Sequence, residues 1–251
     1  MMTRNKVFFL QILMFVFVLL FWQIIGASSE KARFFYSTPY DIFLTFTKDF
    51  VEHTFWWNIT VTLAELVVGF VCGNVLGIFL GLVLWLFPLL GTIARPYVVA
   101  LGSVPVFAIT PLLILWFGIG FTSKVVIVML STFFVALFYA YSTALEIGHE
   151  YEELIKGFGG KRYDLFRHVV FAGTLYRSFS VLKINIGFAL VGVYVAEWIS
   201  SREGIGQYIL KAVSLYDVSR VFVGLIVFIA IALVFNLGLS FIERKLTKYK
   251  F

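Results

Sequence analysis

The chain has 251 residues, of which 61% are hydrophobic and only 14% charged, and its mean hydropathy is +0.97. A soluble globular domain carries about 25% charged residues, so this composition excludes that class and indicates an integral membrane protein. The net charge of +6 arises from 20 basic residues scattered near the ends of apolar runs, which is typical of membrane topology rather than of a nucleic-acid-binding surface.

The apolar runs are continuous rather than alternating, and each is close to or above the ~20 residues that a helix needs to cross a bilayer. Helices satisfy every backbone hydrogen bond within lipid, so the predicted fold class is an all-α integral membrane protein with about six transmembrane helices. The expected spans are residues 7–25, 58–90, 97–118, 125–144, 175–199 and 221–242.

The N-terminal run is apolar apart from Gln11 and Gln23 and carries Trp22 near its far end. A cleaved signal peptide is the alternative, but its apolar region is usually ~7 to 15 residues long. We therefore expect residues 1–27 to be a retained transmembrane helix. Residues 28–56 are expected to be extracytoplasmic, with a short amphipathic helix lying at the membrane interface, and residues 57–251 to form the core domain.

Glycines recur every four residues in the second apolar run, at Gly69, Gly73, Gly77 and Gly81. This spacing places them on one helix face and predicts close approach of a neighbouring helix. The single cysteine, Cys72, lies in the same run. Because no second cysteine is present, we interpret it as a packing residue and expect neither a disulfide nor a metal site.

Proline marks the next region of the chain. Pro88, Gly91, Arg95 and Pro96 predict a short inside loop, and Pro105 and Pro111 predict that the third span is kinked or unwound in its middle. Gly118, Gly120, Ser123 and Lys124 are expected to form the turn that precedes the fourth span.

Orientation follows from the basic residues. With the N-terminus in the cytoplasm, twelve of them fall on the inside and seven on the outside, while Lys183 lies within the membrane. The positive-inside rule therefore favours cytoplasmic N- and C-termini.

A polar stretch at residues 150–172 then faces the cytoplasm. It holds eight charged residues and must contact water or a polar partner. Its sequence predicts one short helix over residues 151–158 and another over residues 161–171, separated by a left-handed cap at Gly159 and Gly160.

Three motifs carry a resemblance to a known family. Glu153-Leu154-Ile155, then Gly159, then the run from Val169 to Ala172 resembles the "EAA…G" loop of membrane subunits of bacterial ATP-driven importers that use a separate binding protein. Leu154, Ile155 and Ala172 depart from that loop. Residues 105–118 resemble the "P-x-x-A-x-x-P-L-x-I-L-W-F-G" segment of the nitrate, sulfonate and taurine subfamily, and Val195-Ala196-Glu197 with Gly204-Ile205-Gly206 resembles its "V-A-E…G-x-G" region.

The resemblance implies a permease subunit with a type I ABC importer-like fold in the bacterial cell membrane. It implies that the subunit lies in the lipid bilayer and assembles with two cytoplasmic ATPase subunits, a second permease subunit and an extracytoplasmic substrate-binding protein. ATP and Mg²⁺ would be bound by the ATPases, and this chain would hold no cofactor. The residues implied to contact the ATPase are Glu152, Glu153, Leu154, Ile155, Phe158, Gly159 and Gly160.

Glu65 is a departure, because the subfamily usually has an arginine near this position. A carboxylate in a transmembrane helix is costly and should face the bundle or a wet cavity. From their depths along the helices, a direct pair between Glu65 and Lys183 is not expected, and Lys183 should snorkel toward the cytoplasm. Glu65, Pro105, Pro111 and Glu197 are the candidate residues of the translocation pathway; a role of Glu65 in packing or assembly is the alternative.

The sequence offers no enzyme chemistry. It contains no phosphate-binding G-x-x-x-x-G-K-[ST] motif, and His53, His149 and His168 are scattered in polar segments without a nucleophile or an orienting acid. A stand-alone secondary transporter that uses Glu65 for ion coupling is the alternative function, and a membrane enzyme or assembly factor is a third class.

Overall fold

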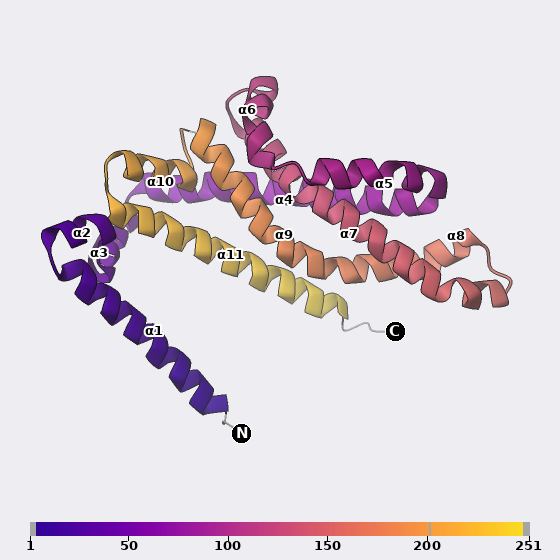
Figure 1. Ribbon diagram of the computed structural model, residues 1–251, viewed down its shortest axis with the longest axis horizontal. Helices are drawn as coiled ribbons and strands as arrows, with labels where there is room; N and C mark the ends of the chain where they lie inside the picture. The colour runs from indigo at the N-terminus through magenta and orange to yellow at the C-terminus, as the bar shows by residue number, and fades with distance from the viewer. Residues whose placement is uncertain (1–3, 201, 248–251) are drawn as a thin grey trace.

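The computed structural model describes residues 4–200 and 202–247, and the secondary structure within them is helical. The long helices α4, α7, α9 and α11 run side by side along the long axis, whereas α1 diverges from them at one end (Figure 1). The helices and their bounds are α1 Arg4–Ala27, α2 Glu30–Tyr36, α3 Pro39–Phe50, α4 His53–Leu86, α5 Pro88–Gly102, α6 Val106–Phe117, α7 Phe121–Gly157, α8 Arg162–Leu165, the π-helix η1 Phe166–Val170, α9 Phe171–Ser200, α10 Ile205–Ser214 and α11 Val218–Thr247.

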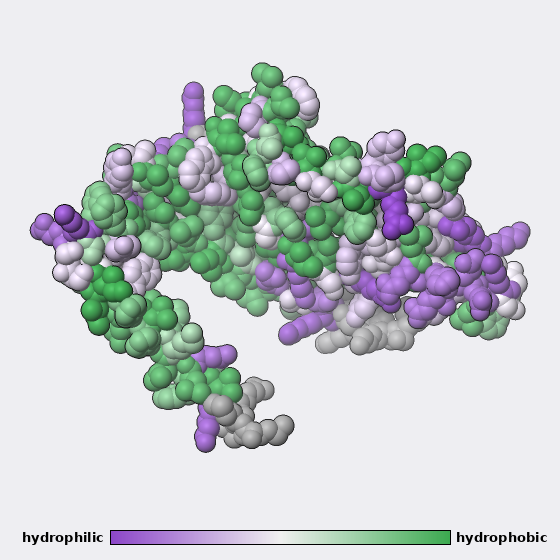
Figure 2. Space-filling model, viewed as in Figure 1, coloured by the Kyte–Doolittle hydropathy of each residue, from purple (hydrophilic) through white to green (hydrophobic). Residues whose placement is uncertain are grey.

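Five of the described helices are long and apolar enough to cross a membrane, and the bent pair α5 and α6 brings the number to six if it counts as one span. Figure 2 shows a largely hydrophobic face that ends, beside α7 and α8, in a concentration of hydrophilic residues. The predicted all-α architecture is therefore confirmed.

The predicted glycine face is also confirmed, and its partner is α7. A Cβ atom added to Gly73 would lie 2.1 Å from Thr132 Oγ1 and 2.5 Å from the Met129 carbonyl oxygen. Gly69, Gly77 and Gly81 meet α7 equally closely. These contacts let α4 and α7 pack backbone against backbone, and this pair shares the most extensive helix contact in the bundle.

The inside loop predicted around Pro88 and Pro96 is wrong, because both residues belong to helix α5. Pro88 occupies the first turn of α5, where backbone N–H groups have no intrahelical acceptor, so a residue without an N–H removes no helical hydrogen bond. Pro96 lies inside the helix. The surrounding chain is apolar, and a backbone placed in lipid keeps its helical hydrogen bonds around a proline rather than exposing them.

The break predicted in the third span lies at residues 103–105, where α5 and α6 meet at an angle of 93°. Pro105 is the N-cap of α6, whereas α6 continues through Pro111. The span is therefore broken once, and the second proline does not interrupt it.

The predicted turn before the fourth span is too long. Only Gly118 and Gly120 have positive φ angles there, and Ser123 and Lys124 are buried in the first turn of α7. Lys183, for its part, contacts Glu243 with Nζ 2.5 Å from Oε2. The expectation that Lys183 does not pair with Glu65 is confirmed. Its ammonium group forms an ion pair with Glu243 rather than extending alone to the membrane surface.

Candidate functional site: a buried charge network and a polar loop

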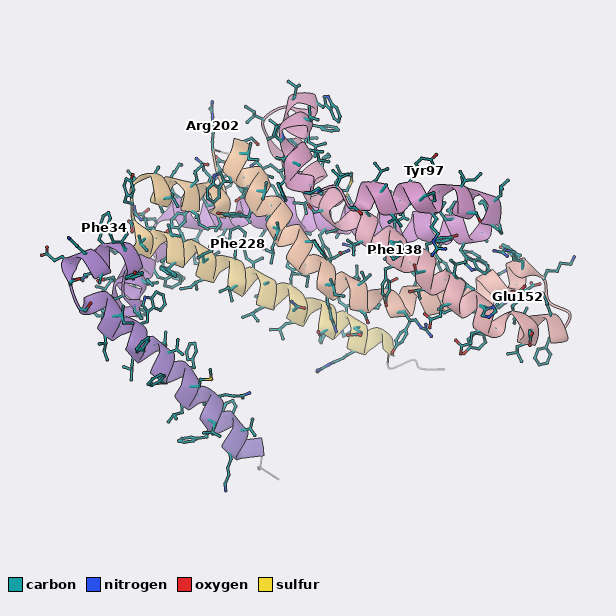
Figure 3. All side chains as sticks on the ribbon, viewed as in Figure 1. Phe34, Tyr97, Phe138, Glu152, Arg202 and Phe228 are labelled. Carbon is teal, nitrogen blue, oxygen red and sulfur yellow. The ribbon has the colours of Figure 1, made fainter. Side chains whose placement is uncertain are left out.

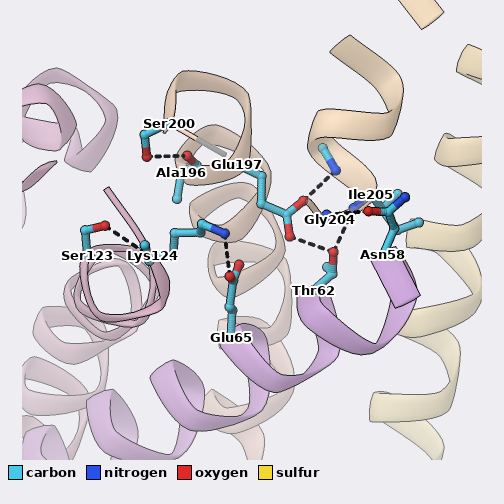
Figure 4. A network of polar contacts seen from close by, with 12 residues as sticks. Asn58, Thr62, Glu65, Ser123, Lys124, Ala196, Glu197, Ser200, Gly204 and Ile205 are labelled. Atoms are coloured by element: carbon cyan, nitrogen blue, oxygen red, sulfur yellow. Dashed lines mark hydrogen bonds and ion pairs between the residues drawn. The ribbon is translucent and has the colours of Figure 1, made fainter. Parts of the chain in front are cut away.

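A buried polar network joins four helices where α7 begins and α9 ends (Figure 4). Glu65 on α4 and Lys124 on α7 form an ion pair with Oε1 and Nζ 2.6 Å apart, and their side chains are 1% and 6% exposed. Glu65 Oε2 has no hydrogen-bond partner among the described residues. Glu65 thus faces the interior of the bundle, as expected, and Lys124 is the partner that the sequence interpretation had placed in an external turn.

Glu197 occupies the other half of this network. Its Oε1 accepts a hydrogen bond of 2.6 Å from the Thr62 hydroxyl, and its Oε2 accepts one of 2.5 Å from the Gly206 backbone N–H. Thr62 in turn accepts from the N–H of Ile205 at 2.8 Å. The Gly204 N–H donates to Asn58 Oδ1 at 2.8 Å, so the first turn of α10 directs its N–H groups at side chains of α4 and at Glu197.

The Gly204-Ile205-Gly206 motif is explained by the same carboxylate. Gly204 has a φ of +106°, and a Cβ atom there would lie 2.3 Å from Glu197 Cδ. A Cβ on Gly206 would lie 2.9 Å from Glu197 Oε2. Glycine is required at both places because the first turn of α10 wraps around the carboxylate, so the "V-A-E" and "G-x-G" segments form one structural unit.

The network contains more acid than base. Two carboxylates and one ammonium are buried in contact with α4, α7, α9 and α10. Burying charges in a low-dielectric region is tolerable only when they are paired and hydrogen-bonded. Lys124 is therefore the residue on which the burial of Glu65 depends, whereas Glu197 is held by the Thr62 hydroxyl and the Gly206 N–H.

The four pathway candidates do not form one site. Glu65 and Glu197 belong to the charge network, whereas Pro105 lines a separate apolar cavity of about 300 Å³ at the break between α5 and α6. α7 and α9 form its other walls, and Phe107, Phe134 and Phe188 supply aromatic rings. Pro111 is absent from this lining. Among the described residues around the cavity, none is charged.

A second buried polar contact joins Asn185 to Asn74 and Thr132, and the sequence patterns did not predict it. Asn185 on α9 donates from Nδ2 to Asn74 Oδ1 at 2.6 Å and to the Thr132 carbonyl at 3.1 Å. Both asparagines are buried. This contact links α4, α7 and α9, and isolated amides within apolar helices were the signal that could have revealed it.

A third cluster holds α3 to α10 and α11. Asp49 on α3 is 1% exposed and accepts hydrogen bonds from Tyr208 on α10 and from Arg220 on α11. Burial, together with the hydrogen bond to Asp49, raises the pKa of the Tyr208 hydroxyl well above its ordinary value. The hydroxyl therefore remains a proton donor to Asp49, and α3, the short amphipathic helix expected within residues 28–56, is anchored by charge as well as by apolar contact.

The loop at residues 150–172 differs from the predicted pair of short helices in its first half. Residues 151–157 continue α7, whose 37 residues extend over about 55 Å at 1.5 Å per residue. Since the hydrocarbon core is ~30 Å thick, one end of α7 projects well beyond it. Glu152 marks this projecting end in Figure 3.

The predicted left-handed cap is confirmed. Gly159 has a φ of +74°, and its N–H donates to the Lys156 carbonyl while the Gly160 N–H donates to that of Ile155, both at 2.9 Å. This pair of bonds is the Schellman arrangement that ends a helix. The chain then turns into α8, η1 and α9.

The seven residues assigned to ATPase contact divide into two sets. Glu153, Leu154, Phe158 and Gly159 are exposed, with Leu154 and Phe158 54% and 84% accessible. Ile155 instead packs against the buried apolar cluster that contains Trp85 and Leu165, and Gly160 lies against Ile155. Glu152 pairs with Lys156 at 2.8 Å. Large apolar side chains exposed beside charges, beyond the membrane, are typical of a protein contact surface.

Comparison with known proteins agrees with this architecture. Residues 73–248 match the family described as the binding-protein-dependent transport system inner membrane component. The chain is 30% identical to the formylaminopyrimidine transport permease protein ThiX of Halalkalibacterium halodurans, over 84% of this chain and 83% of that protein. It is 25% identical to the putative aliphatic sulfonates transport permease protein SsuC of Bacillus subtilis, over 93% and 84% of the two chains.

A solved structure shares the fold. A chain of the inward-facing MetNI methionine ABC transporter superposes with a TM-score of 0.62 at 17% identity, covering 75% of this chain and 94% of that one. These similarities do not favour the alternative of a stand-alone secondary transporter. The chain belongs to the binding-protein-dependent inner membrane components, and it is the non-catalytic, multi-pass permease subunit of an ABC importer with a type I fold, powered by a separate ATPase.

Proposed function

We propose that the exposed part of residues 150–172, centred on Glu153 and Gly159, is where this permease contacts its ATPase. The observation that carries the proposal is the exposed pair Leu154 and Phe158 at the projecting end of α7. In this arrangement both termini are cytoplasmic, while α2, α3 and α10 face the extracytoplasmic binding protein. Two permeases would pair with two ATPases, which bind ATP and Mg²⁺, and closure of the ATPases would move α7 and α9.

The docking proposal is tested by substituting its two central residues. Glu153→Arg reverses an exposed charge, and Gly159→Val places a β-branched residue at a φ of +74°, which such residues rarely adopt. Each variant should lose co-purification with the ATPase or lose transport-coupled ATP hydrolysis. Lys31→Glu, on the opposite end of the molecule, is the charge-reversal control. Normal association and transport in both loop variants would contradict the proposal.

We further propose that the translocation pathway runs past the apolar cavity at Pro105 and the charge network of Glu65 and Glu197, with Pro111 supporting the bent helix beside it. α7 and α9 contribute to both places, since Ile127 and Val195 line the cavity while Lys124 and Glu197 belong to the network. If Glu65→Gln changed assembly but left substrate specificity and the transport rate untouched, Glu65 would be a packing residue and not part of the route.

The charges along this route support an uncharged heteroaromatic solute. Lys124, the cation of the network, is neutralised by Glu65, and a second acid lies beside it. Among the described residues of the cavity lining and of the network, no cation is left unpaired to bind an anion, whereas the cavity offers phenylalanine rings for stacking. Relatives include permeases for formylaminopyrimidine and riboflavin as well as for aliphatic sulfonates, and the neutral lining favours the first two.

Uptake by the reconstituted importer, supplied with its binding protein, tests the solute class. Riboflavin, a formylaminopyrimidine, taurine and an aliphatic sulfonate form the panel. We expect saturable, ATP-dependent uptake for a heterocycle and none for the sulfonate. Glu65→Gln removes one negative charge from the network and releases Lys124 from its ion pair, and it should still leave heterocycle uptake the preferred activity. Saturable sulfonate uptake by the unaltered importer would contradict the assignment.

A further inference from the structure

The cytoplasmic loop is joined to the membrane helices in two different ways. α7 leads directly into it, and α8 and η1 lead directly out of it into α9. A displacement of the loop therefore reaches those two helices through the chain itself. α4 and α5 have no such continuity, because their corner at Phe87 lies more than 60 residues earlier in the sequence.

Arg162 makes the polar contact between the loop and that corner. Arg162, the first residue of α8, donates from Nη2 to the Trp85 carbonyl at 2.7 Å across 77 residues of sequence. Its guanidinium carbon also lies 4.4 Å from the centre of the Trp85 ring. Trp85 is in the last turn of α4, where carbonyls lack their full set of intrahelical partners and the helix dipole favours a cation. Arg162 thus acts as a capping group for α4 and as a cation on its terminal aromatic ring.

Trp85 is held on its other sides by the elements that move with the loop. It is 3% exposed, and its ring stacks on Phe166 of η1 with centroids 5.9 Å apart. On α7, a Cβ atom at Gly148 would lie 2.8 Å from the indole. The end of α4 is therefore wedged between α7 and the start of α9, with Arg162 closing the contact.

We infer that Arg162 and Trp85 form the contact through which movement of the cytoplasmic loop reaches α4 and α5, so that Arg162 is a positioning residue for transport. This inference rests on the docking function proposed above. The consequence matters for the route, because α4 carries Glu65 and the glycine face, and α5 carries the bend at the apolar cavity. Without this contact, movement of the loop would reach α4 only through its packing on α7, and the end of α4 with α5 would follow the loop less closely.

The test compares Arg162→Ala with Arg167→Ala, which removes the same charge from an exposed position one turn further on. Three quantities are measured in the reconstituted complex: ATPase bound per permease, the rate of ATP hydrolysis, and solute taken up per ATP. Arg162→Ala should retain bound ATPase and hydrolysis while solute per ATP falls about tenfold, within the range of typical coupling energies. Arg167→Ala should leave the ratio unchanged.

Two further variants keep the result interpretable. Arg162→Lys retains the charge but loses the planar guanidinium, so it should lie between the wild type and alanine. Trp85→Phe retains the carbonyl acceptor and an aromatic face, and should keep most of the coupling at unchanged thermal stability. A normal ratio of solute to ATP in Arg162→Ala would overturn the inference, as would loss of bound ATPase in that variant. Failure of the docking function would instead appear as normal association in the Glu153 and Gly159 variants.

Discussion

Gly73→Leu is expected to prevent stable packing of α4 on α7. The nearest atoms to a new Cβ are Thr132 Oγ1 at 2.1 Å and the Met129 carbonyl oxygen at 2.5 Å, and a backbone carbonyl in a helix cannot rotate away. Overpacking usually costs about 1–3 kcal/mol, and contact with backbone places this site at or above the upper end. The thermal midpoint of the purified permease, followed by tryptophan fluorescence, should fall sharply or the protein should aggregate.

Two variants calibrate that result. Gly73→Ala adds only the Cβ and should produce a smaller but measurable decrease. Gly238→Leu is the matched control on α11, because no atom lies within 4 Å of the position where its Cβ would be. The close packing of the glycine face would be contradicted by Gly73→Leu protein with the yield and thermal midpoint of the Gly238→Leu control.

Loss of Lys124 is expected to destabilise the permease more than loss of Glu65. Lys124→Met leaves the Glu65 carboxylate buried without its cation, whereas Glu65→Gln leaves Lys124 beside an amide oxygen that can still accept a hydrogen bond. Removing one partner of a buried ion pair costs about 3–5 kcal/mol, and Lys124→Met should approach that value. The double variant Glu65→Gln/Lys124→Met should recover part of the loss, because it removes both charges of the pair together.

A double-mutant cycle on thermal or denaturant stability measures this coupling. The exposed Glu152 and Lys156 pair, at a comparable contact distance of 2.8 Å, supplies the control cycle, and solvent screening should reduce its coupling to an undetectable level. Additive effects of Glu65→Gln and Lys124→Met, or a milder effect of Lys124→Met than of Glu65→Gln, would refute the description of Lys124 as the counterion on which buried Glu65 depends.

The sequence alone was sufficient for those features that depend on local or periodic patterns. Continuous apolar runs require helices in lipid, and glycines spaced by four must share one face, so both the fold class and the close packing of Gly73 were predictable. The cap at Gly159 was predictable for a similar reason, since a glycine pair after an amphipathic turn has few other conformations available. The motif at residues 105–118 likewise indicated the family before any comparison.

Sequence reasoning failed where a residue's role depends on a distant partner. Pro88 and Pro96 suggest a loop because proline disrupts an isolated helix. In an apolar environment an open loop would leave more backbone groups without hydrogen bonds than a helix that contains proline, so the helix has the lower free energy. Lys124 was assigned to a turn because glycines precede it. Nothing local shows that 59 residues earlier a carboxylate on α4 faces the same position.

The sequence by itself thus determined that this chain is a helical membrane permease with a polar loop at residues 150–172, because hydropathy and short motifs act within a few turns of chain. Only the tertiary structure decided that Lys124 neutralises Glu65, that Glu197 fits between Gly204 and Gly206, and that Arg162 reaches Trp85. Each of these contacts joins different helices, and its existence depends on the rotation and depth at which those helices pack, which no single segment encodes.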